Sequence, residues 1–342
     1  MSPTISVIVT VYNRFELTKR AVESVLAQTV PVSEVIVMDD GSIDGTSELL
    51  PKYIAGNPSW RERVHYSHQE NQGPGAARNN GIAKARGEWL AFIDNDDLWL
   101  PQKLEWQFRA LDQFKDQCGA CITDAWFMNN PYMKMTLFQL AGKQHSQTIG
   151  MIPDPLKYML GTNSVVGVHP VWLQNLVTRT ELARQVGGFD PKLRFGDDDD
   201  FAFRLGCDTK FCFVNMPMVM IDRTPPAERH VGANRRWDDE DFRLQMAQIR
   251  FDKRLRLSDR FQSEIRKTIR KNLAAVHSGW ANWFLKKKEY DKARKAVAEA
   301  ARIYLTPNLA IKWALTRSAP RLARKVMLMR EEYRSRRTVG IA

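Results

Sequence analysis

Three groups of acidic residues in this chain have the types and spacing to take part in chemistry. Asp39 and Asp40 follow one apolar run, Asp94 and Asp96 follow another, and four consecutive aspartates occupy positions 197–200. Carboxylates can hold a divalent cation beside a diphosphate, and an ionised carboxylate can take the proton of a hydroxyl group. The spacing alone does not show that the three groups meet, so the elements that carry them must decide the question.

Strands and helices alternate along the N-terminal part of the chain. Apolar, β-branched runs predict strands at 5–10, 35–38, 64–66 and 89–93, and apolar residues at helical spacing predict helices at 16–28, 46–55 and 76–85. This alternation predicts an α/β fold with a mostly parallel sheet and helices on both of its faces. Ligands of such sheets bind at the carboxyl ends of the strands, which is where Thr10, Asp40 and Asp94 fall.

The pattern changes twice further along the chain. Residues 125–180 are rich in Met, Pro and aromatic residues without a regular period, which predicts a variable loop region. From Asp241 onward the periodicity is helical, and residues 274–307 resemble one tetratricopeptide-type helical hairpin, which must pack on other elements to bury its apolar face. We therefore expect a catalytic domain at 1–240 and a helical C-terminal region at 241–342.

Charge separates the same two parts of the chain. Residues 1–240 hold 25 Lys and Arg against 30 Asp and Glu, a net charge of −5, whereas the last 102 residues hold 26 against 9, a net charge of +17. Basic residues between 321 and 337 share a stretch with Leu322, Val326 and Met329 at helical spacing. This combination favours an anionic membrane surface over nucleic acid as a partner, with a solvated charged helix as the alternative.

Targeting signals are missing from the sequence. No apolar run approaches the roughly 18 residues of a membrane-spanning helix, and no secretion signal is visible at the N-terminus. We therefore expect a cytoplasmic protein that is at most peripheral on the membrane. Cys118 and Cys121 form a C-x-x-C pair without further ligands nearby, which indicates reduced structural thiols rather than a zinc site.

Several short motifs occur in an order that is typical of one enzyme family. They are Ser6–Asn13, Asp39–Thr46, Asn71–Gly73 with Ala77–Asn79, Phe92–Asp97, Val186–Asp190, and Gly196–Asp198 followed by Arg204. Together they resemble the family 2 glycosyltransferases, and the resemblance covers roughly residues 4–236. The resemblance implies a GT-A fold, a nucleotide-sugar donor, a divalent cation such as manganese or magnesium, and transfer to an acceptor hydroxyl with inversion at the anomeric carbon.

The resemblance assigns donor-binding roles to residues of the first motifs. Tyr12 is expected to lie on the donor's base, with Thr10 and Asp40 at the base and ribose. Asp94 and Asp96 occupy the D-x-D element, in which Asp96 is the metal ligand while Asp94 faces the ribose or the water shell of the cation. Carboxylate oxygens of this kind suit magnesium or manganese.

The remaining site residues carry alternatives. Asp198 stands where the family places its catalytic base, with Asp197 as its nearest rival. His230 is either a further metal or phosphate ligand or a surface residue, and Arg78 either neutralises donor phosphate or packs a helix against the sheet. Asp97 is expected to cap the next helix, which should begin near Pro101.

Donor and acceptor follow only from the family resemblance. It favours a UDP-sugar donor and a glycan or lipid-linked acceptor, in the synthesis of a surface polysaccharide, lipopolysaccharide or glycoconjugate. A sugar nucleotidyltransferase is the first alternative, but such enzymes begin with a Gly-rich loop where this chain has Tyr12–Phe15. A non-catalytic protein that binds an anionic surface or nucleic acid is the second alternative, and a dehydrogenase is disfavoured because no G-x-G-x-x-G follows the first strand.

Overall fold

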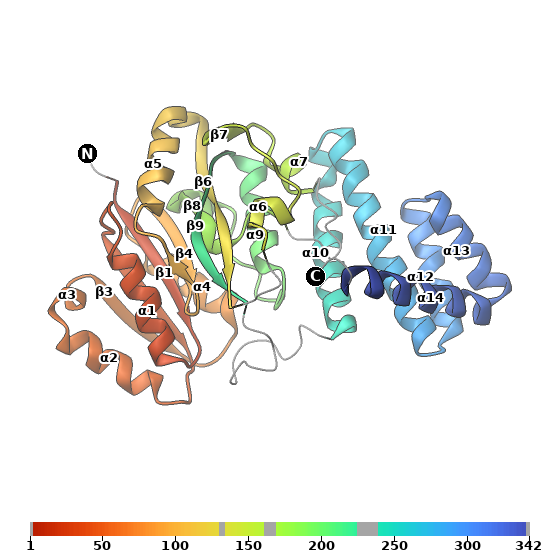
Figure 1. Ribbon diagram of the computed structural model, residues 1–342, viewed down its shortest axis with the longest axis horizontal. Coiled ribbons are helices and arrows are strands. Elements are labelled where there is room, and N and C mark those ends of the chain that lie inside the picture. The colour runs from red at the N-terminus through yellow and green to blue at the C-terminus, as the bar shows by residue number, and fades with distance from the viewer. Residues whose placement is uncertain (1–2, 130–133, 161–168, 224–238, 340–342) are drawn as a thin grey trace. The chain divides into compact units, whose positions relative to one another are not determined.

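The computed structural model describes residues 3–129, 134–160, 169–223 and 239–339. The chain divides into two compact units with the main boundary after Ala233, and each unit is described by itself. The first unit contains one sheet with helices packed on it, and the second, which we call the helical unit, contains the helices from residue 240 onward (Figure 1).

A single sheet organises the first unit. Its strands follow the order β3-β2-β1-β4-β8-β6-β9-β5, with β7 paired to β9. The strand bounds are β1 Ile5–Val11, β2 Glu34–Asp40, β3 Val64–Gln69, β4 Trp89–Asp94, β5 Leu98–Trp99, β6 Cys118–Met128, β7 Ile149–Ile152, β8 Leu176–Arg179 and β9 Lys210–Asp222. The expected α/β fold is thereby confirmed, and the expected strands lie within β1 to β4.

Parallel pairing is confined to two parts of this sheet. Strands β3, β2, β1 and β4 run parallel to one another, as the strand–helix alternation predicts, and β6 is parallel to β9. Strands β5, β7 and β8 are antiparallel to their neighbours, so the sheet as a whole is mixed. Both types of pairing occur together in large sheets of this class.

Helices cover both faces of the sheet. Alternate residues of β1 such as Val7 and Val9 belong to the large core with side chains of α1, α2 and α5, while Ile8 faces Gly81 of α4. Phe92 of β4 lies on this second face and packs edge-on against Phe201 of α9. The helix bounds are α1 Phe15–Leu26, α2 Thr46–Gly56, α3 Pro58–Arg61, α4 Pro74–Lys84, α5 Lys103–Phe114, α6 Leu137–Leu140, α7 Pro155–Leu160, α8 Thr180–Gln185 and α9 Asp197–Asp208.

The segment 125–180 is more regular than the sequence indicated. It contains the end of β6, the short helices α6 and α7, and the strands β7 and β8. Apart from β6, these elements are only four to six residues long. Such lengths are too short to show a reliable period in the sequence. The prediction of a loop region was therefore wrong for the described part of this segment.

The helical unit consists of α10 Glu240–Leu257, α11 Ser263–Lys286, α12 Tyr290–Ile303, α13 Pro307–Ser318 and α14 Pro320–Val339. Helices α11 and α12 pack against each other as a hairpin, in the place of the expected tetratricopeptide-type unit. Two small hydrophobic clusters hold these helices together, one around Ala281 and Val297 and the other around Leu285 and Met327. Within the described residues, no helix is long and apolar enough to cross a membrane.

Candidate active site

The carboxyl ends of β1, β2 and β4 form the centre of the candidate site. Thr10 of β1 is paired in register with Asp94 of β4, and the Thr10 hydroxyl donates to Asp94 Oδ1 over 3.3 Å. Gln174 also donates to Asp94, with 2.6 Å between Nε2 and Oδ2. The expected meeting of residues from separate strands at this edge therefore occurs.

Arg78 connects the D-x-D element to the run of four aspartates. Its guanidinium, on α4, donates to Asp94 over 2.8 Å and to Asp197 over 2.6 Å, and the side chain is only 8% exposed. The two carboxylates hold the pKa of Arg78 above its usual value despite burial, so the guanidinium stays charged. One buried cation thus joins two acidic motifs that are far apart in the sequence.

The next residue of α4 fixes a third motif. Asn79 receives a hydrogen bond from the Phe189 backbone N–H over 2.7 Å and donates to the Phe189 carbonyl over 2.8 Å. A Cβ atom at Gly188 would come within 2.3 Å of Asn79 Oδ1, so this approach depends on glycine. These contacts hold the Val186–Asp190 segment, which leads into α9, against α4.

The four aspartates occupy the first turn of α9, where the helix dipole favours negative charge. Asp197 pairs with Arg78, and Asp200 pairs with Arg204 over 2.8 Å. Side-chain exposure separates them: Asp198 is 31% exposed, whereas Asp197, Asp199 and Asp200 are 11%, 9% and 1% exposed. Asp198 is therefore the carboxylate of this run that another molecule can reach.

Asp197 differs from Asp198 in that its carboxyl is buried. Burial raises the pKa of the Asp197 carboxyl to about 6, with Arg78 opposing the rise and the negative charges of Asp198 and Asp94 adding to it. Its carboxylate is held by a short charge-assisted hydrogen bond to Arg78. A carboxylate in this position is suited to orienting Arg78 rather than to receiving a proton from a substrate.

Sequence reasoning missed two residues of this site. The imidazole of His169 lies 3.9 Å from Asp198 and 4.0 Å from Asp199, and its buried Nδ1 makes no hydrogen bond to any described residue. Gln174, which binds Asp94, lies in the same part of the chain. Both belong to the segment that was expected to be a variable loop, and only their polar character among apolar neighbours could have marked them.

The loop after β1 is tied to the D-x-D element. Asn13 and Arg14 have left-handed backbone conformations, with φ of 62° and 71°. Arg14 donates to Asp96 Oδ2 over 2.8 Å, and the Asn13 carbonyl accepts from the Asn95 side chain over 3.1 Å. The Asn13 backbone N–H donates to the Ser42 hydroxyl, and Asn13 Oδ1 accepts from the Ile43 backbone N–H. Asn13 therefore connects three of the motif segments.

Asp96 fits the role of a metal ligand, although it does not make a complete site. Burial and the nearby charge of Asp94 raise the pKa of its carboxyl, and Arg14 opposes this rise. Among the described residues no group of three or more His, Cys, Asp and Glu side chains could hold a metal ion. Magnesium is commonly held by one or two carboxylates together with substrate phosphates and water, which agrees with Asp96. His230 lies outside the described residues.

Asp40 has structural partners at the end of β2. Its oxygens accept from the backbone N–H groups of Gln72 and Gly73, over 2.9 Å and 2.8 Å, and from Gln69 Nε2 over 2.8 Å. Gly41 follows with φ of 78°, and a Cβ atom there would come within 2.8 Å of the Asn71 backbone nitrogen. Asp40 thus fixes the loop after β3, while its contact with a donor stays a prediction. Tyr12 is half-buried at the end of β1.

Asp97 does not cap the next helix, contrary to the prediction from the sequence. Its carboxylate accepts from the backbone N–H of Asp222 over 2.8 Å, at the end of β9, and the next helix begins only at Lys103. Burial and the charges of Asp96 and Asp94 raise the pKa of the Asp97 carboxyl well above its usual value. Asp97 therefore joins the D-x-D loop to β9, a long-range contact that the local sequence does not indicate.

Comparison with known proteins agrees with the motifs. Residues 6–172 match the family described as Glycosyl transferase family 2. An uncharacterized glycosyltransferase of Rickettsia typhi is 28% identical over 208 residues, covering 59% of this chain and 58% of that protein. The succinoglycan biosynthesis protein ExoO of Rhizobium meliloti is 40% identical over 120 residues, covering 35% of this chain and 32% of that protein. The chain thus spans less than two thirds of the length of either relative.

Solved structures share the fold. TarS 1–349 of S. aureus in complex with UDP-GlcNAc has a TM-score of 0.63 at 18% identity, covering 97% of this chain and 92% of that one. The mannosyltransferase PcManGT of Pyrobaculum calidifontis in complex with GDP-Man and Mn²⁺ has a TM-score of 0.56 at 20% identity, covering 96% and 84%. The fold is that of the GT-A glycosyltransferases. The motifs assemble at one edge of this fold, and residues 6–172 of the chain match a glycosyltransferase domain of family 2.

Proposed function

We propose that this protein is an inverting, metal-dependent glycosyltransferase that transfers a sugar from a nucleotide diphosphate to an acceptor hydroxyl. One observation carries the proposal. Arg78 brings the D-x-D element and the aspartates of α9 into a single network, and in this network Asp198 alone among the four consecutive aspartates keeps a substantially exposed carboxylate. A carboxylate beside a phosphate-binding edge is the arrangement that this reaction needs.

Asp198 acts as the general base in this proposal. Its carboxylate takes the proton of the acceptor hydroxyl while the acceptor oxygen forms a bond to the anomeric carbon. The bond between that carbon and the β-phosphate oxygen breaks on the opposite face, and the electron pair leaves with the nucleoside diphosphate. Attack in line with the leaving group inverts the configuration. His169, 3.9 Å from this carboxylate, and Arg78, which pairs with the neighbouring Asp197 and interacts electrostatically with Asp198, act as positioning residues.

Donor binding is assigned to the edge formed by β1, β2 and β4. Tyr12 lies on the base, Thr10 and Asp40 bind the base and ribose, and Asp94 faces the ribose. Asp96, together with the diphosphate oxygens, holds a magnesium or manganese ion. When bound, this cation neutralises the charge that develops on the leaving diphosphate. Arg14, which is 2.8 Å from Asp96, adds positive charge at the same place.

We infer a UDP-sugar as the donor and a glycan or lipid-linked hydroxyl as the acceptor, in the synthesis of a cell-surface polysaccharide or glycoconjugate. UDP-GlcNAc in the TarS structure supports a uridine nucleotide, whereas GDP-Man in PcManGT makes a guanosine nucleotide the alternative. The relative ExoO is named for succinoglycan biosynthesis, which supports a polysaccharide product.

Nucleotide binding tests the assignment directly. Thermal unfolding is measured with UDP, GDP, CDP and ADP, each with manganese and each with a chelator. We expect UDP with manganese to raise the melting temperature most, and Asp96→Asn to lose the manganese-dependent part. Asp112→Asn, which removes an exposed carboxylate on α5, is the control and should respond as the wild type does. Stabilisation by UDP that is equal in chelator and in manganese contradicts the metal role.

The basic C-terminal helix α14 bears on where the protein acts in the cell. We propose that α14 brings the protein to an anionic membrane surface, where basic residues each contribute about 1 kcal/mol. Arg321, Leu322, Lys325 and Met329 are exposed on this helix, whereas Val326 is partly buried, so the expected apolar stripe is incomplete. The association should therefore be reversible and sensitive to salt.

Vesicle sedimentation tests this location. Arg321→Gln combined with Lys325→Gln should release the protein from anionic vesicles, whereas Lys52→Gln with Lys84→Gln, two exposed lysines of the first unit, should not. Substitution is preferable to deleting α14, because Ala323 and Met327 of this helix are buried in the helical unit. Equal sedimentation of both double variants excludes the idea.

A further inference from the structure

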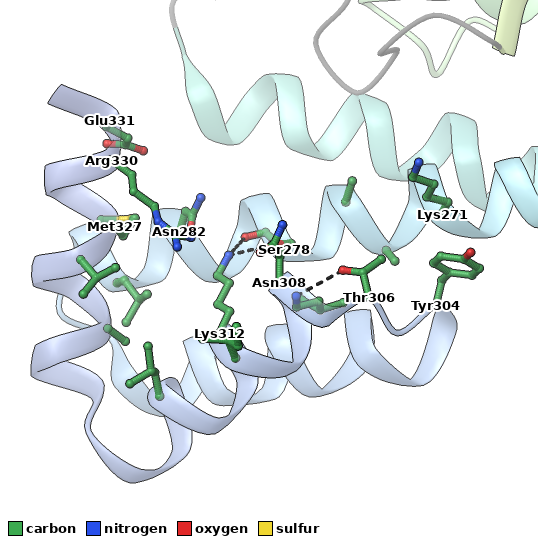
Figure 2. Close-up of a pocket in the computed structure, with 18 residues that line it drawn as sticks. Lys271, Ser278, Asn282, Tyr304, Thr306, Asn308, Lys312, Met327, Arg330 and Glu331 are labelled. Atoms are coloured by element: carbon green, nitrogen blue, oxygen red, sulfur yellow. Dashed lines mark hydrogen bonds between the residues drawn. The ribbon is translucent and has the colours of Figure 1, made fainter. Parts of the chain in front are cut away.

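A cavity lies inside the helical unit, lined by α11, α13, α14 and the segment between α12 and α13 (Figure 2). Its volume is about 500 Å³, which is within the range of small-molecule pockets in proteins. Ala274 and Leu309 of one hydrophobic cluster line it, as do Leu285 and Met327 of the other. The cavity is thus located where the two small cores of this unit do not meet.

Lys312 enters this cavity without an acidic partner. From α13 its Nζ donates to the backbone carbonyl of Ser278 over 2.5 Å and to the Ser278 hydroxyl over 2.7 Å, both on α11 (Figure 2). No ion pair joins it to any described residue. An ammonium group has three N–H donors, so one donor of Lys312 lacks a hydrogen-bond partner among the described residues, and Glu331 acts on its charge without forming an ion pair. Burial accordingly lowers the pKa of Lys312 to about 8.

The other polar groups of the cavity favour an anion. Glu331 is the acidic residue among the described lining, and it forms an ion pair with Lys286 over 3.1 Å. Arg330 has no ion-pair partner among the described residues, and its guanidinium can donate two parallel hydrogen bonds to a phosphate. Asn282 follows Ser278 by one helical turn, so it lies on the face of α11 that Lys312 contacts (Figure 2).

Apolar side chains form the rest of the wall. Leu309, Leu315, Val326 and Met327 line the cavity beside the polar groups, and they come from α13 and α14. A free inorganic anion would satisfy Lys312 and leave this apolar surface facing water. A ligand with an anionic head and an apolar chain fits both parts of the wall.

We propose that the cavity is a binding site for a phosphate monoester carried on an apolar chain. The phosphate accepts hydrogen bonds from Lys312, Arg330 and Asn282, and the chain lies along the apolar side chains of α13 and α14. Two cations and an amide donor can bind the several oxygens of a phosphate head group, whereas a carboxylate head group offers only two oxygens. The site uses no residue of the sheet, so it stands or falls independently of the proposed transfer reaction.

Calorimetric titration of the full chain with decyl phosphate, below its micelle concentration, tests the proposal. Inorganic phosphate, decanoate and decyl maltoside are titrated in parallel, and each should bind at least about tenfold more weakly than decyl phosphate. Lys312→Met and Arg330→Gln should each weaken decyl phosphate binding by about tenfold or more, the scale of a lost hydrogen bond to a charged group. Lys295→Gln removes an exposed charge of α12 outside the cavity and should change affinity by less than about twofold.

Each contrary result has a distinct meaning. Absence of decyl phosphate binding, or equal weakening by Lys295→Gln, overturns the site. Equal affinity for decanoate overturns the choice of phosphate, and equal affinity for inorganic phosphate overturns the role of the apolar wall. Because Arg330 is exposed, its variant keeps the test valid if Lys312→Met does not fold.

Discussion

Two lysines, the buried Lys103 and the half-buried Lys312, show how differently charge is accommodated in the two units. In the first unit, Lys103 lies 3.9 Å from the centroid of the Trp99 ring and donates to Gln107 over 2.9 Å. Gln107 in turn donates to two backbone carbonyls, so the chain of contacts closes inside the core. Lys312 of the helical unit also bonds only to neutral acceptors, but it opens onto a cavity.

The same contrast holds for the charges around them. Arg78 and Arg204 of the first unit each meet carboxylates at hydrogen-bond distance, and the net charge of this part of the chain is slightly negative. The helical unit has an excess of basic residues, and those near Lys312 find few acids. The buried arginines of the first unit are paired within the fold, whereas Lys312 and Arg330 of the helical unit have no ion-pair partner among the described residues.

Removal of Arg78 should disrupt the buried ion-pair network of the first unit and cause the largest loss of stability. Arg78→Met leaves Asp94 and Asp197 without their shared counter-ion, so we expect the free energy of unfolding to fall by about 3–5 kcal/mol. Arg109→Met, which removes half of an exposed pair with Glu105, should cost less than about 1 kcal/mol. Urea unfolding of both variants provides the measurement, and equal losses would show that the buried network is no stronger than a surface pair.

Loss of the proposed base should affect catalysis with little effect on the fold. Asp198→Asn should reduce the rate of sugar transfer by about a hundredfold or more while donor affinity stays unchanged. Asp199→Asn, its buried neighbour, should reduce the rate much less. Transfer rates and donor affinities of both variants decide the matter. If Asp197→Asn is inactive while Asp198→Asn turns over normally, the base has been assigned one residue too late.

The smallest expected effect concerns Lys103 and pH. Burial lowers the pKa of Lys103 to about 7, below the 10.5 of a free lysine, so the unfolded chain binds the extra proton between these values. The wild type should therefore gain stability as pH rises from 7 toward 10, and the stability of Lys103→Met relative to the wild type should fall over this interval, by at most about 1.4 kcal/mol per pH unit.

Chemical denaturation of both proteins at several pH values provides the measurement for Lys103. Lys52→Met, at an exposed position of α2, is the matched control and should follow the wild type at every pH. If the difference in free energy of unfolding between Lys103→Met and the wild type does not vary between pH 7 and 10, Lys103 keeps its proton in the folded state. Its pKa would then not be lowered by burial.

Much of the fold could be predicted from local patterns. The strands β1, β2 and β4 are β-branched or apolar runs, and their shared direction follows from the helices between them. By contrast, β7 and β8 are four residues long and antiparallel, so they leave no periodic signal and are defined only by their pairing partners. Tertiary contacts decided the structure of the segment 125–180.

The candidate site divides in the same way. Motif order proposed Asp96 and the run of aspartates as site residues, but the sequence alone could not separate Asp198 from its neighbours. That distinction depends on the direction of each side chain in the first turn of α9 and on the arginines that reach it. The contacts of Asp97, His169 and Gln174 all join residues distant in sequence, which no local pattern records.

Asn13 has a consequence for the thermodynamics of donor binding. Through its backbone and side chain it connects the loop after β1, the turn after β2 and the D-x-D loop. Segments that are already joined lose little conformational entropy when a ligand orders them, so more of the contact energy is available as affinity. Asn13→Ala should therefore weaken donor binding mainly through a less favourable binding entropy, even though the side chain itself need not contact the nucleotide.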